Sequence, residues 1–177
     1  MEDAPEKLNA QAKAAYLASN FDSATSLYLE AEQAYKNSND LLMATEMANN
    51  RSVALLQVGK AEAALQASED THLIFAEAGD NLREGYALGN QAAAFKELGQ
   101  KNISLKLYKL SAEKLAFAGD KENLAVVQKT IATLEMEGGN PIKAMGAMLE
   151  ALRSKEKLTM REKIMCKLFS TVSRLMP

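Results

Sequence analysis

The sequence has little of several residue types on which other classes of protein depend. Cys166 is its only cysteine, which excludes an internal disulfide and a cysteine-based metal cluster within one chain. His72 is its only histidine, so we expect no zinc site. No apolar run reaches the roughly 18 residues of a membrane-spanning helix. The acidic stretch MEDAPEKLNA lacks the basic start and apolar run of a secretory signal, so we expect a cytoplasmic protein.

Aromatic residues and prolines are also scarce. Long segments between them are rich in Ala, Lys and Glu. Val, Ile and Thr do not cluster in these segments, which favours helices over strands. With 47% apolar and 25% charged residues, the 177 positions have the composition of one globular domain, residues 1–177. We therefore predict an all-α fold.

Catalytic motifs are missing as well. The sequence contains no GxxxxGK[ST] phosphate loop, no GxGxxG after a strand and no HExxH. His72 and the carboxylate pairs, such as Glu62 with Glu69, are typical of helix surfaces and packing positions. We expect no enzyme activity, no catalytic residues, no cofactor and no metal.

The net charge of −2 is unevenly distributed along the chain. Residues 153–177 carry a net charge of +5, and the remainder carries −7. The basic segment is either a solvated helix face or a surface for an anionic partner or membrane. Outside it no basic stripe is interleaved with aromatics, so we expect no nucleic-acid binding.

The stretch AEAGD at 76–80 is followed forty residues later by AFAGD at 116–120. Other residues recur with the same spacing. Residues that lie forty apart in the sequence occupy the same repeat position. Turn residues share one such position, small residues share three, and aspartate shares another: Ser19, Gly59, Gly99 and Gly139; Ala24, Ala64, Ser104 and Ala144; Ala31, Thr71, Ser111 and Ala151; Ala12, Ser52, Ala92 and Ala132; Asp40, Asp80 and Asp120. A fixed period of this length is typical of stacked structural units.

Each Gly-Asp pair fits a boundary between two helices. Gly79 and Gly119 can adopt the left-handed conformation that ends one helix, and Asp80 and Asp120 can accept the free amide hydrogens that begin the next. Small residues at fixed positions let paired helices approach closely. We therefore predict four antiparallel helix pairs, in repeats over about 5–40, 41–80, 81–120 and 121–155.

Within each repeat the turn residue separates a first helix from a second helix. We predict first helices near 5–18, 41–57, 81–98 and 121–137, and second helices near 21–37, 60–78, 100–118 and 141–155. A further helix, at about 159–176, is predicted from Thr159 and Glu162, which have the spacing of a capping box. Its apolar stripe is expected to cover the exposed flank of the last repeat: Met160, Ile164, Leu168, Val172 and Leu175.

The repeat resembles the tetratricopeptide repeat, whose second helix carries Ala, three residues and an aromatic. Ala24 with Tyr28 and Ser104 with Tyr108 fit this pattern, and NRSVALLQVGKAEAAL at 50–65 is similar to a family repeat. The large aromatic expected early in the first helix is absent, since those positions hold Leu8, Ala48, Leu88 and Gln128. The forty-residue period resembles that of the kinesin light chain and of vesicle-fusion adaptors.

The resemblance implies a right-handed α-solenoid with a C-terminal capping helix, whose first helices line a concave groove for an extended or helical peptide. The family's groove asparagine falls on Asn50 and Asn90, whose amides would clamp a peptide backbone or else hydrogen-bond between helices. The other expected groove residues are Asn49, Val53, Tyr86, Lys13, Lys96 and Lys129. Of the positions with which some family members bind chaperone carboxylates, only Asn50 matches, which argues against that ligand.

The function expected from this resemblance is a non-catalytic adaptor or scaffold that binds a peptide or helix of another protein. Two alternatives stay open. The chain is a structural subunit that contacts partners through its ends or convex face, or its basic C-terminal helix recruits it to a membrane surface.

Overall fold

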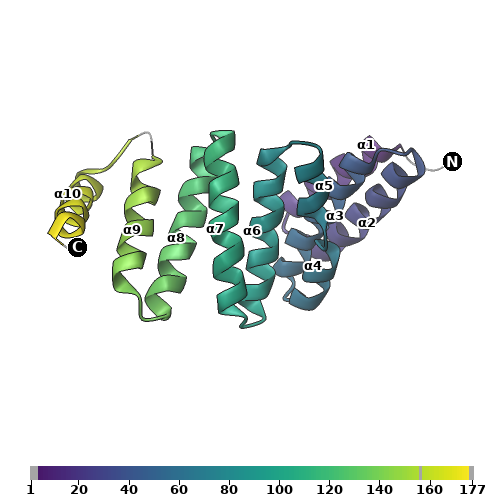
Figure 1. Cartoon of the computed structure of the whole chain (residues 1–177). Helices are drawn as coiled ribbons and strands as arrows, with labels where there is room; N and C mark the ends of the chain where they lie inside the picture. Colours follow the sequence, from purple (N-terminus) through teal and green to yellow (C-terminus); the bar gives the residue numbers. More distant parts are fainter. Residues whose placement is uncertain (1–3, 156, 176–177) are drawn as a thin grey trace.

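The computed structural model describes residues 4–155 and 157–175, with side chains as far as Thr171, and this part of the chain contains α-helices and no strand. Figure 1 shows the helices side by side in a row, with the described N-terminal end at one extreme and the C-terminal helix at the other. The predicted all-α fold is thereby confirmed. Residue 176, the predicted last residue of the C-terminal helix, lies outside the described residues.

The helices alternate as predicted between first and second helices of successive pairs. The first helices are α1 (Pro5–Leu17), α3 (Leu41–Gln57), α6 (Asn81–Glu97) and α8 (Lys121–Glu137). The second helices are α2 (Phe21–Asn37), α4 (Ala61–Ala67) with α5 (Thr71–Glu77), α7 (Lys101–Ala118) and α9 (Pro141–Arg153). The last helix is α10 (Met160–Leu175). Helices adjacent in sequence pack together in pairs, and each pair packs against the next.

The helix ends have the chemistry that the sequence predicts. Gly79 and Gly119 have φ values of 71° and 77°, in the left-handed region where glycine is favoured. Asp80 accepts a hydrogen bond from the amide of Arg83 at 2.9 Å, and Asp120 accepts one from the amide of Asn123 at 3.1 Å. The Gly-Asp pairs are therefore boundaries between helices, as expected.

The predicted second helix at 60–78 is wrong, because it is interrupted between α4 and α5. Asp70 has a φ of 57°, and residues 68–70 form a turn. In this turn the carbonyl of Ser68 accepts hydrogen bonds from the backbone amide and the hydroxyl of Thr71 and from the side chain of Gln91. Ser68 occupies the repeat position that Tyr28 and Tyr108 hold in continuous helices.

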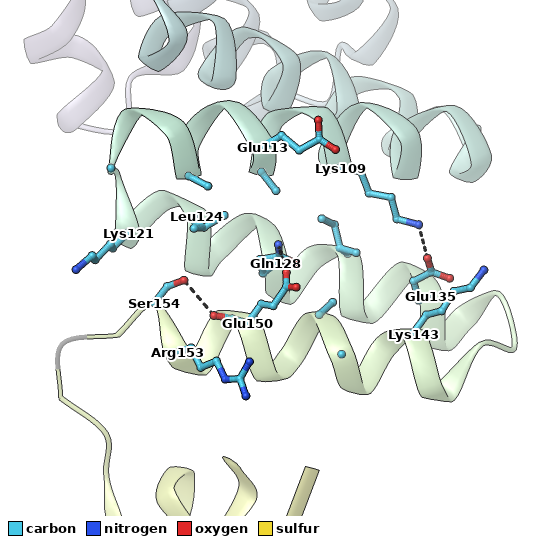
Figure 2. Close-up of a pocket in the computed structure, with 16 residues that line it drawn as sticks. Lys109, Glu113, Lys121, Leu124, Gln128, Glu135, Lys143, Glu150, Arg153 and Ser154 are labelled. Carbon is cyan, nitrogen blue, oxygen red and sulfur yellow. Dashed lines mark hydrogen bonds and ion pairs between the residues drawn. The ribbon is translucent and has the colours of Figure 1, made fainter. Parts of the chain in front are cut away.

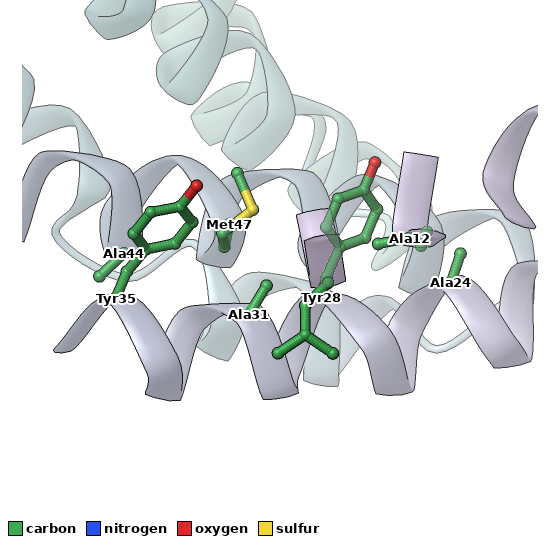
Figure 3. Packing of buried hydrophobic residues seen from close by; sticks show 9 residues of the cluster. Ala12, Ala24, Tyr28, Ala31, Tyr35, Ala44 and Met47 are labelled. Atoms are coloured by element: carbon green, nitrogen blue, oxygen red, sulfur yellow. The ribbon is translucent and has the colours of Figure 1, made fainter. Parts of the chain in front are cut away.

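The small residues predicted to lie between helices are buried throughout the array. At the three small repeat positions every residue is at most 4% exposed. In α6–α7 the hydroxyl of Ser104 donates to the carbonyl of Ala92 at 2.7 Å, and that of Ser111 donates to the carbonyl of Gly85 at 2.7 Å. Figure 3 shows the N-terminal core, where Tyr28, Tyr35 and Met47 fill the space beside the buried alanines. Large and small residues together give close packing between neighbouring helices.

The last helix differs from its prediction in one respect. Thr159 and Glu162 form the expected capping box, in which the amide of Glu162 donates to the Thr159 hydroxyl and the amide of Thr159 donates to the Glu162 carboxylate. However, Met160, Ile164 and Leu168 are 76%, 57% and 59% exposed. The prediction that this stripe covers the last repeat is therefore wrong for these three residues, and the side chains of Val172 and Leu175 lie outside the described residues. The helix packs on α9 through a different side.

Candidate functional site

The predicted groove residues lie on α1, α3, α6 and α8, and we call the outer side of these helices the first-helix face; Asn49 on α3 is buried. Asn50 is half-buried on α3, and its side chain makes no hydrogen bond within the described part of the chain. Val53, one turn further along α3, is also half-buried, and Lys13 on α1 is exposed. These three side chains therefore leave polar and apolar surface open on this face.

The two predicted asparagines Asn50 and Asn90 do not act as an equivalent pair. The Nδ2 atom of Asn90 donates to Oδ1 of Asn49 at 3.1 Å, which joins α6 to α3. Asn49 is only 6% exposed. Asn90 thus makes the inter-helix hydrogen bond, while the amide of Asn50 has no hydrogen-bond partner among the described residues.

Tyr86 joins two helix pairs. Its hydroxyl donates to Oδ2 of Asp120, the N-cap of α8, at 2.5 Å, and Asn123 also reaches this hydroxyl. Burial, followed by the hydrogen bond to Asp120, raises the pKa of Tyr86 to about 12. The carboxyl of Asp120 keeps a lowered pKa although burial acts to raise it, because the hydrogen bonds from Tyr86 and Asn123 outweigh that effect. Tyr86 is therefore a link between α6 and α8.

The preceding repeat has a similar link by different chemistry. Glu46 shares the repeat position of Tyr86 and accepts from Arg83 at 3.1 Å. Arg83 in turn donates to Asp80, the N-cap of α6, at 2.6 Å and lies 5.3 Å from the centre of the Phe75 ring. Sequence analysis missed both links, although their repeat positions relative to Asp80 and Asp120 were available as a signal.

Two of the predicted lysines come together at a hollow between α6 and α8. Lys96 and Lys129 line it, and it has a volume of about 190 Å³. Lys96 lies 3.3 Å from Glu97, whereas Lys129 is exposed and forms no ion pair with any residue that the structure describes. Glu137, which also lines the hollow, is held by Lys101 at 2.8 Å.

The hollow contains the repeat positions on which the prediction of a groove was based. Thr130 lines it and shares a repeat position with Asn50 and Asn90. Thr133 lines it and shares a repeat position with Lys13 and Val53. The same two positions are therefore at least partly exposed on α1, α3 and α8, whereas on α6 Asn90 bonds to Asn49 and Ala93 packs against the core.

A larger groove, which sequence analysis did not predict, lies on the opposite side between α7 and α9, with α8 as its floor (Figure 2). Its volume is about 880 Å³. Small residues widen it, since Ala112, Ala116, Gly146 and Ala147 are among those that line it. The only sequence signal was this row of alanines and one glycine, which is equally typical of tight packing.

Ion pairs and hydrogen bonds span the floor and walls of this groove. Lys109 on α7 lies 2.6 Å from Glu135 on α8, whose side chain is only 3% exposed. Gln128 on α8 donates to Glu150 on α9 at 2.7 Å, in the centre of Figure 2. Charges of both signs line the groove, so it has no single electrostatic character.

Residues with metal-binding or redox chemistry do not gather in the described structure. Among the described residues no three His, Cys, Asp or Glu side chains are grouped so that they could hold a metal ion. Cys166 is a half-buried free thiol on α10, and Nδ1 of His72 is buried with no hydrogen-bond partner among the described residues. None of the helices in the described ranges is long and apolar enough to cross a membrane.

No protein-family model and no curated protein matches the sequence.

Proposed function

We propose that the chain is a non-catalytic adaptor, a right-handed solenoid of the tetratricopeptide kind, that binds an extended or helical segment of a partner protein on its first-helix face. The segment lies across α3, α6 and α8, from the free amide of Asn50 to the hollow beside Lys129.

The observation that carries this proposal is that two repeat positions are at least partly exposed on both α3 and α8. Thr130 and Thr133 line the α6–α8 hollow, and two periods earlier Asn50 and Val53 are half-buried on α3. A solenoid presents equivalent positions of successive units along one continuous surface, and such surfaces bind extended ligands. The polar side chains at these positions can bond to a peptide backbone without selecting its sequence.

Charge on this face favours a segment that brings one carboxylate or a row of backbone carbonyls to the hollow. Lys129 has no ion pair within the described residues, while Lys96 and Glu137 already have partners in Glu97 and Lys101. Among the residues that line this hollow, one unpaired cation therefore lies beside paired charges, which favours a ligand of mixed charge over a strongly acidic one.

The test is quantitative affinity capture with the intact chain and with the variant Asn50→Ala/Lys129→Ala. Loss of one hydrogen bond and one charge contact at the site amounts to about 1.4 kcal/mol or more, so we expect retention of the captured partners to fall at least about tenfold. Neither side chain has a structural partner among the described residues, so the variant is expected to keep its melting temperature.

The matched control is Asn102→Ala/Lys106→Ala, which removes the same two side-chain types from exposed positions of α7. This variant is expected to capture partners as the natural chain does. Equal capture by both variants would overturn the proposed face, and selective loss in the control would move the site to the second helices.

A further inference from the structure

The helix α10 presents two distinct sides. The side towards the rest of the structure holds half-buried residues, Glu162, Cys166, Phe169 and Ser170. These positions lie within about 100° of one another around a helix with 3.6 residues per turn. The remaining arc, which faces away from α9, is the subject of the inference.

Apolar residues occupy the centre of that outer arc. Met160, Ile164 and Leu168 follow one another at intervals of four residues, and 57% or more of each is exposed. Met165, at the edge of the arc, is 37% exposed. No described residue covers this stripe, although an apolar face of this kind is normally buried.

Among the residues of α10 whose side chains the structure describes, cations accompany the stripe and carboxylates do not. Lys163 and Lys167 border it on one side, and Arg161 lies close to Leu168 around the helix axis. All three are exposed and make no ion pair with any residue in the described ranges. Glu162, the acidic residue of the helix, lies on the inner side and is bound to Lys155 and Thr159.

The position of α10 in the molecule separates these cations from the acidic part of the chain. Residues 153–177 carry +5, whereas the rest of the chain carries −7. Figure 1 shows α10 at one end of the row, so the other helices extend away from it. An anionic surface that meets this end of the molecule is attracted by α10 while the acidic helices stay at a distance.

We propose that α10 lies in the interface of an anionic membrane, with Met160, Ile164 and Leu168 inserted among the acyl chains and with Lys163, Lys167 and Arg161 at the lipid phosphates. An apolar stripe bordered by unpaired basic residues is the pattern of helices that lie in a membrane surface. A protein groove would also accept the apolar stripe, but the unpaired cations and the absence of outward carboxylates favour a surface of dense negative charge. The inference goes beyond the proposed peptide binding and does not depend on it.

The experiment uses the full chain with sedimenting vesicles of phosphatidylcholine alone and of phosphatidylcholine with about a third phosphatidylserine. We expect binding to the anionic vesicles only, weakening as salt is raised. Each basic residue near such a surface contributes about a factor of five to partitioning, so Lys163→Gln/Lys167→Gln is expected to bind about thirtyfold more weakly. The control Lys106→Gln/Lys143→Gln removes two exposed lysines from α7 and α9 and is expected to bind within about twofold of the natural chain.

A second measurement tests insertion without removing a contact. Because the sequence has no tryptophan, Leu168→Trp creates a single fluorophore on the exposed stripe. Its emission is expected to shift to the blue with anionic vesicles, and that of Leu110→Trp on α7 is expected to stay unchanged.

Equal binding to neutral and anionic vesicles, or no change with Lys163→Gln/Lys167→Gln, would overturn the proposal. A concentration-dependent dimer that Ile164→Ser abolishes, together with no vesicle binding, would also overturn it and assign the stripe to a second copy of the chain. These three outcomes are independent of capture by Asn50→Ala/Lys129→Ala, so failure here leaves the proposed function standing.

Discussion

The helix pairs α6–α7 and α8–α9 have the same forty-residue pattern, yet a glycine has opposite surroundings in the two. A Cβ at Gly85 on α6 would lie 3.0 Å from the side chain of Leu115 and 3.3 Å from its backbone nitrogen. At Gly146 on α9, no heavy atom of the described structure other than its chain neighbours and the backbone of its own helix lies within 4 Å of the added Cβ. The first glycine permits close helix packing, whereas the second lines the open groove between α7 and α9.

Repeat position, more than residue type, determines this difference. The position of Gly85 is buried in the neighbouring repeats too, where it holds Thr45 and Ala125. The position of Gly146 is exposed in every repeat, where it holds Ser26, Gln66 and Lys106. A period read from the sequence can therefore assign a glycine to the interior or the surface before its contacts are known.

The largest expected effect is on the closely packed pair, through Leu115. Its side chain is 1% exposed and packs against Gly85, so Leu115→Ala is expected to lower the free energy of unfolding by about 2–5 kcal/mol. Leu110→Ala, on the same helix but 45% exposed, is expected to change it by about 0.5 kcal/mol or less. Urea unfolding followed by circular dichroism measures both, and equal losses would contradict the described packing.

The next effect concerns Gly85 itself. Gly85→Ala gains about 1 kcal/mol of helix propensity but overpacks the interface at a cost of about 1–3 kcal/mol, so we expect a net loss of about 1 kcal/mol. The loss is expected to disappear in the background of Leu115→Ala, because the shorter side chain leaves room for the added methyl group. A Gly85→Ala chain that is more stable than the natural one would show that α6 and α7 lie further apart.

Gly146→Ala is the matched change in the open pair, and its expected sign is opposite. The new methyl group meets no described atom beyond its chain neighbours and its own helix backbone, and the helix gains propensity, so we expect a stabilisation of about 0.5–1 kcal/mol. Thermal and urea unfolding measured beside Gly85→Ala give the comparison directly. Destabilisation at this site would mean that the α7–α9 groove is closed in solution.

The smallest expected effect is on the link between the two pairs. The pKa of Tyr86 is raised to about 12 in the folded chain, so its contribution to stability is complete below pH 10, where an unfolded tyrosine is also protonated. It is lost as the pH rises towards 12, because the unfolded chain then ionises first. Tyr86→Phe is expected to make this alkaline loss shallower, and Tyr108, whose pKa burial raises to about 12, is expected to preserve part of it. Unfolding curves from pH 8 to about pH 12 check the slope, and an unchanged slope would contradict the hydrogen bond to Asp120.

Most of the fold could be predicted because the repeat fixes helix ends by local chemistry. Gly79 with Asp80 and Gly119 with Asp120 end and begin helices through their own backbone and side chains. The break at Ser68 could not be predicted in this way, since one donor to its carbonyl is the side chain of Gln91, which is distant in sequence. The absence of an aromatic at that repeat position was the sole local sign.

The candidate site could be predicted only in part, because outward positions follow from the period whereas partners do not. The family resemblance predicted Lys96 and Lys129 in one groove, and the structure brings them to one hollow. It did not reveal that Asn90 bonds to Asn49, since those two residues are not at the same repeat position. Similarly, the stripe on α10 has helical spacing whether it is buried or exposed, and only the packing of α9 distinguishes the two.

The most direct test of the account is to place a photo-reactive amino acid at Lys129, in the α6–α8 hollow, and separately at Glu113, in the α7–α9 groove. Both side chains are exposed, and neither makes an ion pair with a residue that the structure describes. After illumination with bound partners, we predict that mass spectrometry finds partner peptides attached at position 129 and few at position 113. Partner peptides attached only at position 113 would contradict the assignment of binding to the first-helix face.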